Sequence, residues 1–143
     1  MRVMGLDYGE KTIGVAVSDG LGITAQGIIT IRRRSFDKDF VQLKKYIEEY
    51  EVGEIVIGLP KNMDGSLGPS ADKALAFAEK LKKEFGLPVA MYDERLSTAF
   101  AQKALIEGDV SRAKRKKVID MLAAQVILQG YMDRKKAGGK SGD

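Results

Sequence analysis

After Met1 the sequence reads RVMGLDYGEKTIGVAVSDGLGITAQGIITI (residues 2–31), in which three apolar, largely β-branched segments are separated by two short turns. Each segment predicts a β-strand. The three predicted strands are residues 2–7, 12–18 and 24–31. Both turns contain glycine, which supplies the backbone freedom that a tight turn requires. Because the connections are so short, the three strands are expected to form an antiparallel meander.

Beyond this meander the hydrophobic period changes to three and four residues, starting at Phe36, which predicts a helix with Ser35 as its N-cap. The further predicted elements are a strand at 54–58, a helix from Ser70, its expected cap, to Phe85, a strand at 88–93, a helix from Ser97 to about Glu107, and a helix at about 113–135. This order predicts an α/β fold with a mixed five-stranded sheet, three antiparallel strands followed by two parallel ones, and helices on both faces.

The length of 143 residues suits one domain, expected at residues 1–137, with a flexible tail at 138–143 because the chain ends in Gly, Lys and Ser. No apolar run approaches the roughly 20 residues of a membrane helix. The N-terminus also lacks a signal-peptide pattern, since its short apolar run meets Asp7 at once. We therefore expect a cytoplasmic protein without a membrane partner.

The chain contains no Cys and no His, which excludes disulfides, Cys/His zinc sites and a Ser-His-Asp triad. The net charge is +4, and the basic residues are clustered. The three clusters are Arg32–Arg34, a run of Arg112, Lys114, Arg115, Lys116 and Lys117, and Arg134–Lys136. Such clusters are typical of surfaces that bind a phosphate backbone, although a solvated surface is an equally good interpretation of each cluster alone.

Three acids stand out against this background. Asp7 ends the first strand among apolar neighbours, where a carboxylate is costly unless it is paired or binds a cation. Asp120 lies in an otherwise apolar helical segment, which predicts a buried carboxylate; the alternative is a salt bridge to the basic loop. Asp93 and Glu94 lie at the end of the fifth strand, at the sheet edge where sites form in open α/β proteins; the alternative for Glu94 is a surface acid paired with Arg95.

Three separated acids without any His suggest a site for hard divalent cations, Mg²⁺ or Mn²⁺, that serves phosphodiester hydrolysis. Two such ions would polarise the phosphate and stabilise the attacking and leaving oxygens. Without cations the three carboxylates would repel one another and at least one pKa would rise.

Four segments resemble the motifs of the YqgF/RuvX family. They are Gly5–Ala16, Gly58–Ser66, Asp93–Thr98 and Lys116–Ala124, which together span nearly the whole chain in order. The resemblance implies an RNase H-like fold related to the RuvC Holliday junction resolvases. It also implies a nuclease that matures the 5′ end of pre-16S rRNA in the ribosomal precursor particle, with Asp7, Glu94 and Asp120 as catalytic acids and metal ligands.

The sequence departs from the RuvC pattern at the fourth strand, which ends in Gly58-Leu59-Pro60 with no acid before Asp64. The acid has in effect moved to the fifth strand. If the strand order is 3-2-1-4-5, strands one and five lie two steps apart, roughly 10 Å between backbones. The longer side chain of Glu94 spans such a gap more easily than Asp93 does.

The predicted contacts with nucleic acid are cations and one amide beside these acids. They are Lys11, Asn62, Arg95, Arg112, Lys114, Arg115, Lys116 and Lys117. For Lys11 a solvated turn is the simpler interpretation.

Three alternative functions remain open. The first is a homodimeric resolvase of branched DNA, for which a twofold dimer is needed. The second is a non-catalytic RNA-binding assembly factor. The third is an actin-like ATPase or sugar kinase, which also opens with Asp-x-Gly but needs two such domains. The sequence does not decide between a monomer and a homodimer.

Overall fold

The computed structural model describes residues 1–62, 64–93 and 112–138, with the backbone alone for 112–117, 137 and 138. The elements are β1 (Arg2–Tyr8), β2 (Thr12–Ser18), β3 (Ala25–Arg32), α1 (Phe36–Glu49), β4 (Val52–Leu59), α2 (Pro69–Phe85), β5 (Val89–Asp93) and α4 (Arg112–Gly138). The helix predicted from Ser97 lies outside the described residues, as does the predicted tail apart from Gly138.

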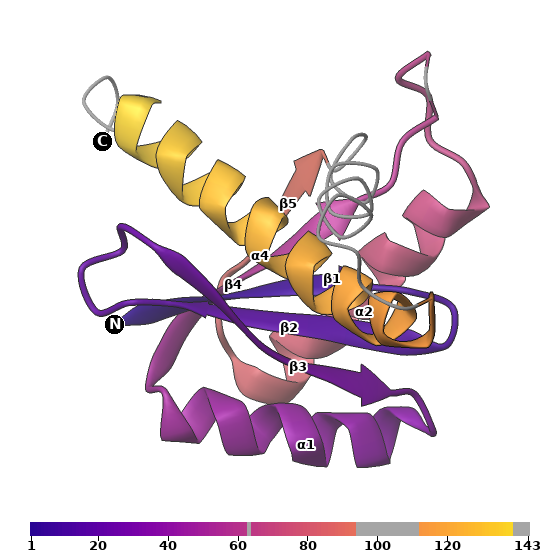
Figure 1. Cartoon of the computed structure of the whole chain (residues 1–143), viewed down its shortest axis with the longest axis horizontal. Helices are drawn as coiled ribbons and strands as arrows, with labels where there is room; N and C mark the ends of the chain where they lie inside the picture. Colours follow the sequence, from indigo (N-terminus) through magenta and orange to yellow (C-terminus); the bar gives the residue numbers. More distant parts are fainter. Residues whose placement is uncertain (63, 94–111, 139–143) are drawn as a thin grey trace.

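The five strands form one sheet in the order β3-β2-β1-β4-β5. The pairs β1–β2 and β2–β3 are antiparallel, and β1–β4 and β4–β5 are parallel, which confirms the predicted mixed sheet. Helices α1 and α2 cover one face, and α4 crosses the other (Figure 1). The carboxyl ends of β1, β4 and β5 therefore share one edge of the sheet.

The face covered by α1 and α2 holds a core of large apolar side chains. Alternate strand residues, such as Leu6 and Ile57, meet Leu43 of α1 and Leu81 of α2, and all four are fully buried. Side chains at every second strand position point to the same face, which is why the apolar residues of β1 and β2 meet these helices.

The face covered by α4 is built from small residues instead. A Cβ added at Gly5 would lie 2.7 Å from the Leu128 Cβ, and one at Gly27 would lie 2.7 Å from the Met121 Cγ. No real Cβ tolerates such approaches, so glycine is what lets the α4 backbone lie directly against the strands.

Polar side chains of α4 fasten the helix to the two sides of the sheet. Gln129 Oε1 accepts a hydrogen bond from the Ala25 N–H of edge strand β3 at 2.9 Å, and Gln125 Oε1 accepts one from Gly27 N–H at 3.2 Å. On β4, Glu54 accepts a hydrogen bond from the Tyr131 hydroxyl and pairs with Lys135 Nζ at 3.0 Å. These contacts fix the position of α4 along the sheet.

The helix ends test three predictions. Ser35 caps α1, as predicted, because its Oγ accepts a hydrogen bond from Lys38 N–H at 3.2 Å. Gly86 ends α2 in the left-handed conformation, with φ of 65°. The prediction of Ser70 as the cap of α2 is wrong. The N-cap is Gly68, because Pro69, whose fixed φ suits the first helical position, already begins the helix.

In the part of the chain that the structure describes, no helix is both long and apolar enough to cross a membrane.

Candidate active site

Asp7 lies near the carboxyl end of β1 and is partly buried. It follows Gly5 by two positions, so strand alternation places its side chain on the face that α4 covers. In the antiparallel pairing of β1 with β2, the residue opposite Asp7 is Gly14. Gly14 has no side chain, and the space above it is open to α4.

Asp120 of α4 fills the space above Gly14. A Cβ built on Gly14 would lie 1.9 Å from the backbone oxygen of Asp120 and 2.4 Å from its carbonyl carbon. The backbone of Asp120 therefore rests on the residue that is paired with Asp7. The structure brings two of the three predicted catalytic acids to one place, on the same face and at the same end of the sheet.

The Asp120 carboxylate is held by Thr12, the residue two positions before Gly14 on β2. Thr12 Oγ1 donates a hydrogen bond to Asp120 Oδ2. Full burial of Asp120 was a wrong expectation, because this part of α4 lies at the end of the sheet and the side chain is only partly buried. Thr12 is the described partner of this carboxylate, and the alternative of a salt bridge to the basic loop falls on side chains outside the described residues.

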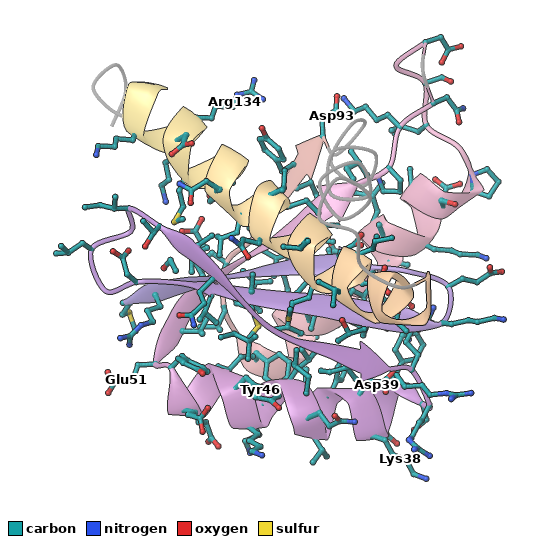
Figure 2. All side chains as sticks on the ribbon, in the orientation of Figure 1. Lys38, Asp39, Tyr46, Glu51, Asp93 and Arg134 are labelled. Carbon is teal, nitrogen blue, oxygen red and sulfur yellow. The ribbon has the colours of Figure 1, made fainter. Side chains whose placement is uncertain are left out.

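Glu94 and Arg95 lie outside the described residues. The last described residue before them, Asp93, ends β5 at the edge of the sheet (Figure 2) and pairs with Lys61 Nζ at 3.9 Å. The described residues contain no group of three metal-ligating side chains. The strand order confirms that β4 separates β1 from β5, which was the basis for favouring the longer Glu94.

A groove of about 1360 Å³ runs beside Asp120 and across the ends of β2 and β3 to the start of α1. We call it the basic groove, and its cationic lining residues are Lys11, Arg32, Arg33 and Arg34. Lys11, predicted to contact nucleic acid, is exposed there. Within the described ranges, Lys11, Arg32 and Arg34 form no ion pair. Their charges are available to an anionic ligand.

Arg33 has a different role, because it fixes the β1–β2 turn. Its Nη1 donates hydrogen bonds to the backbone oxygens of Gly9 and Glu10, at 2.8 and 2.9 Å. The guanidinium also lies 4.3 Å from the ring centroid of Tyr8, which stacks on Phe77. Burial raises the pKa of the Tyr8 hydroxyl, and the Arg33 charge opposes this rise. Arg33 thus holds the turn that joins Asp7 to Thr12.

The other predicted nucleic-acid contacts lie apart from the groove or are described only in part. The Asn62 amide donates a hydrogen bond to Ser66 Oγ at 3.0 Å, inside a loop that the Lys61–Leu67 bridge closes. The basic run comprises Arg112, Lys114, Arg115, Lys116 and Lys117, and its backbone forms the first turns of α4, on the side of Asp120 that begins the helix.

Two features of the site were not predicted from the sequence. Thr12 carried no signal, because its partner Asp120 is 108 positions away. The closeness of α4 to the sheet did have a signal, since Gly5, Gly14 and Gly27 interrupt strands that are otherwise β-branched, and such glycines mark a close approach of another backbone.

Among the solved structures with a similar fold are resolvases bound to Holliday junctions. The Thermus thermophilus RuvC bound to a Holliday junction covers 96% of this chain and 96% of its own, with a TM-score of 0.58 and 15% identity. The fowlpox virus resolvase with a Holliday junction covers 94% and 98%, with a TM-score of 0.58 and 13% identity. The fold is therefore the RNase H-like α/β fold of the RuvC-type resolvases.

Sequence comparison identifies the family within this class. A family model described as "RuvX: Holliday junction resolvase" matches residues 1–134, and the chain belongs to this family. A Thermoanaerobacter pseudethanolicus protein named "Putative pre-16S rRNA nuclease" is 58% identical over 95% of this chain and 99% of its own length. A Desulfitobacterium hafniense protein with the same name is 61% identical over 93% of this chain and 92% of its own. The chain is thus a nuclease, a hydrolase of ester bonds.

Proposed function

We propose that this chain is a metal-dependent nuclease that hydrolyses phosphodiester bonds with Asp7, Glu94 and Asp120. One observation carries the proposal: the backbone of Asp120 rests on Gly14, the cross-strand partner of Asp7. Two acids that are far apart in the sequence thereby lie on the same face and at the same end of the sheet, as ligands of a shared metal site must.

The donor set fits Mg²⁺ or Mn²⁺, since hard cations prefer oxygen ligands and the chain has no His or Cys to offer. Asp7 and Asp120 would supply two carboxylates, and Glu94 would supply the third from beyond β5. Thr12 engages one oxygen of Asp120, which orients the carboxylate as a polar neighbour of a metal ligand does. The bound ions would activate a water molecule and stabilise the charge that develops on the phosphate.

The substrate we propose is pre-16S rRNA, which the name of the two relatives contains. We further propose that the chain acts on its 5′ region, in a ribosomal precursor particle in the cytoplasm. The predicted contacts would hold its backbone near the acids through charge. They are Lys11, Asn62, Arg95, Arg112, Lys114, Arg115, Lys116 and Lys117. Phosphate contacts of this kind position a substrate without reading its sequence.

A second candidate function is Holliday junction resolution, which the description of the family model and the fold both favour. A resolvase must cut two strands symmetrically and would therefore act as a twofold dimer. A gel-filtration mass, together with cleavage of a four-way junction beside the precursor RNA, separates the two functions.

The decisive experiment incubates the purified chain with a 5′ fragment of pre-16S rRNA in Mg²⁺, in Mn²⁺ and in EDTA. Asp7→Asn, Asp120→Asn and Glu94→Gln are compared with Asp72→Asn, which removes an exposed acid of α2, on the face of the sheet opposite α4. We expect cleavage only with metal, lost in the first three variants and retained in Asp72→Asn.

Two other outcomes contradict the proposal. Equal trace cleavage by the wild type and Asp7→Asn would identify a contaminating nuclease. RNA binding without cleavage under any metal condition would make the chain an assembly factor on a nuclease fold.

A further inference from the structure

We propose that the basic groove is a binding track for single-stranded nucleic acid, which leads from the acids across β2 and β3 to a base-stacking position at Phe36. The inference rests on the proposed nuclease function for the identity of the ligand. It adds the path of the strand and its single-stranded character, which the catalytic acids do not determine.

The track begins next to Asp120. Thr12 binds the carboxylate of Asp120, and the residue opposite Thr12 on β3 is Arg32. Directly opposed residues of an antiparallel pair point to the same face, with Cβ atoms about 5 Å apart. Arg32 is exposed and without an ion pair among the described residues, so it offers a charge one side chain away from the acid.

The track continues where the chain leaves β3. Arg34 lines the groove, and its backbone N–H donates a hydrogen bond to Asp39 Oδ1 at 3.1 Å. Asp39 is only 3% exposed and turns toward the sheet, whereas its neighbour Lys38 points to solvent (Figure 2). The buried Asp39 therefore anchors the backbone of Arg34, while the guanidinium of Arg34 remains without an ion pair among the described side chains.

Phe36 lies at the far end of the groove and is 38% exposed. Its ring is supported from behind by Phe40 and Phe77, with centroid distances of 6.1 and 6.5 Å. Lys80 Nζ lies over the face of the ring, 4.4 Å from its centroid. A base that stacks on Phe36 would take the place of this flexible ammonium group, which could then pair with the adjacent phosphate.

This combination favours a single strand over a duplex. Proteins that bind single strands join a cationic groove to aromatic side chains on which bases stack. In a duplex the faces of the bases are already stacked on one another, so Phe36 would gain nothing from it. The groove is also lined by the acids Glu10, Asp39 and Asp120, so binding there must depend on a few placed cations rather than on a broad positive surface.

The test measures fluorescence anisotropy of a short, unstructured, labelled RNA and of its duplex, in EDTA and over a series of salt concentrations. Arg32→Gln/Arg34→Gln removes two groove charges, and Phe36→Leu removes the ring but keeps apolar bulk. Lys44→Gln/Lys83→Gln is the matched control, because it removes two exposed charges of α1 and α2 outside the groove. Melting curves verify that each variant is folded.

We expect the double arginine variant to bind the single strand at least about tenfold more weakly, with a salt slope lower by about 0.7 for each lost phosphate contact. Phe36→Leu should weaken single-strand binding about fivefold or more, with little change in duplex binding. The inference is overturned if the arginine variant binds like the lysine control, or if Phe36→Leu weakens both ligands equally.

The two proposals fail separately, because binding is measured without metal. If the chain binds RNA through the groove but never cuts it, the binding track is supported and the nuclease proposal fails. If the chain cuts RNA with metal but the groove variants bind as the wild type does, the nuclease proposal is supported and the binding track fails.

Discussion

The two faces of the sheet are assembled in opposite ways. Under α1 and α2, large side chains such as Leu6, Leu43 and Leu81 fill the space between the layers. Under α4, the strands present Gly5 and Gly14, and the helix backbone itself is in contact with the sheet. One face gains stability from buried volume, and the other gains a fixed distance between two backbones.

The difference explains why both described acids are on the α4 face. A carboxylate works as a metal ligand only if its position is held within a fraction of an ångström. Layers that meet through long side chains can repack, whereas a helix that rests on glycine cannot move closer. The α4 face therefore suits a site, and the opposite face suits the core.

The largest effect is expected where the two backbones touch. Gly14→Ala would place a methyl group 1.9 Å from the Asp120 oxygen, so α4 must move. Because the obstacle is backbone and cannot rotate away, we expect a loss of about 3 kcal/mol or more in the free energy of unfolding and no cleavage. Thermal melting and the RNA assay measure both effects.

Gly20→Ala is the control for this substitution, since nothing lies within 4 Å of the added Cβ there. Its melting temperature and cleavage rate should match those of the wild type. A Gly14→Ala variant that melts like Gly20→Ala would show that α4 is not in backbone contact with the sheet.

A substitution in the core under α1 and α2 should lower the stability of the fold but leave the cleavage rate unchanged. Leu43→Ala removes a fully buried side chain and should cost roughly 2–5 kcal/mol of stability. Well below its melting temperature, the variant should still cleave RNA at the wild-type rate per folded molecule. A lowered rate under those conditions would show that the core under α1 also sets the position of the acids.

A substitution at Thr12 can separate the positioning of the Asp120 carboxylate from the packing of the surrounding side chains. Thr12→Val keeps the shape of the side chain but removes the hydrogen bond to Asp120, at a cost of roughly 1–3 kcal/mol. We expect the Mn²⁺ concentration required for half-maximal cleavage to rise about 10- to 100-fold. Thr12→Ser restores the hydroxyl and should restore the metal requirement; equal behaviour of the Val and Ser variants would argue for a purely structural role.

The smallest effect is expected at the edge of the α4 face. Gln129→Leu removes hydrogen bonds to Ala25 N–H and to the Ile23 carbonyl, at 2.9 and 2.8 Å. Both backbone groups are near solvent, so the cost should be about 1 kcal/mol or less. Hydrogen exchange should accelerate at the Ala25 amide and stay unchanged at Ile57 of β4; uniform acceleration would instead indicate global destabilisation.

Local patterns were enough to predict the strands and the outer limits of most helices. The alternation of large and small residues in 12–18 indicates which face of β2 packs on the core of large side chains, and Ser35 and Gly86 indicate helix ends through their own conformational preferences. Ser70 misled because a good capping residue was outweighed by Pro69 next to it.

The sequence singles out two of the candidate acids, Asp7 and Asp120, but not the contacts that hold them. Asp7 and Asp120 were recognisable as carboxylates in apolar surroundings. The approach of Thr12 to Asp120 depends on where a whole helix docks, and no local pattern encodes that position. Arg33 and Arg34 look alike in the sequence and both line the groove, yet the guanidinium of Arg33 is engaged by the backbone oxygens of the β1–β2 turn and that of Arg34 is not.

The docking of α4 on Gly14 also bears on the synthesis of the protein. The ribosome makes β1 to β5 before α4, so Asp7 is present long before Asp120 reaches it. During that interval the nascent chain contains Asp7 but not Asp120, and α4 does not yet cover the glycine and alanine residues on its face of the sheet. A product truncated before residue 112 would lack Asp120, so with the role proposed for Asp120 any cleavage activity depends on translation having passed through α4.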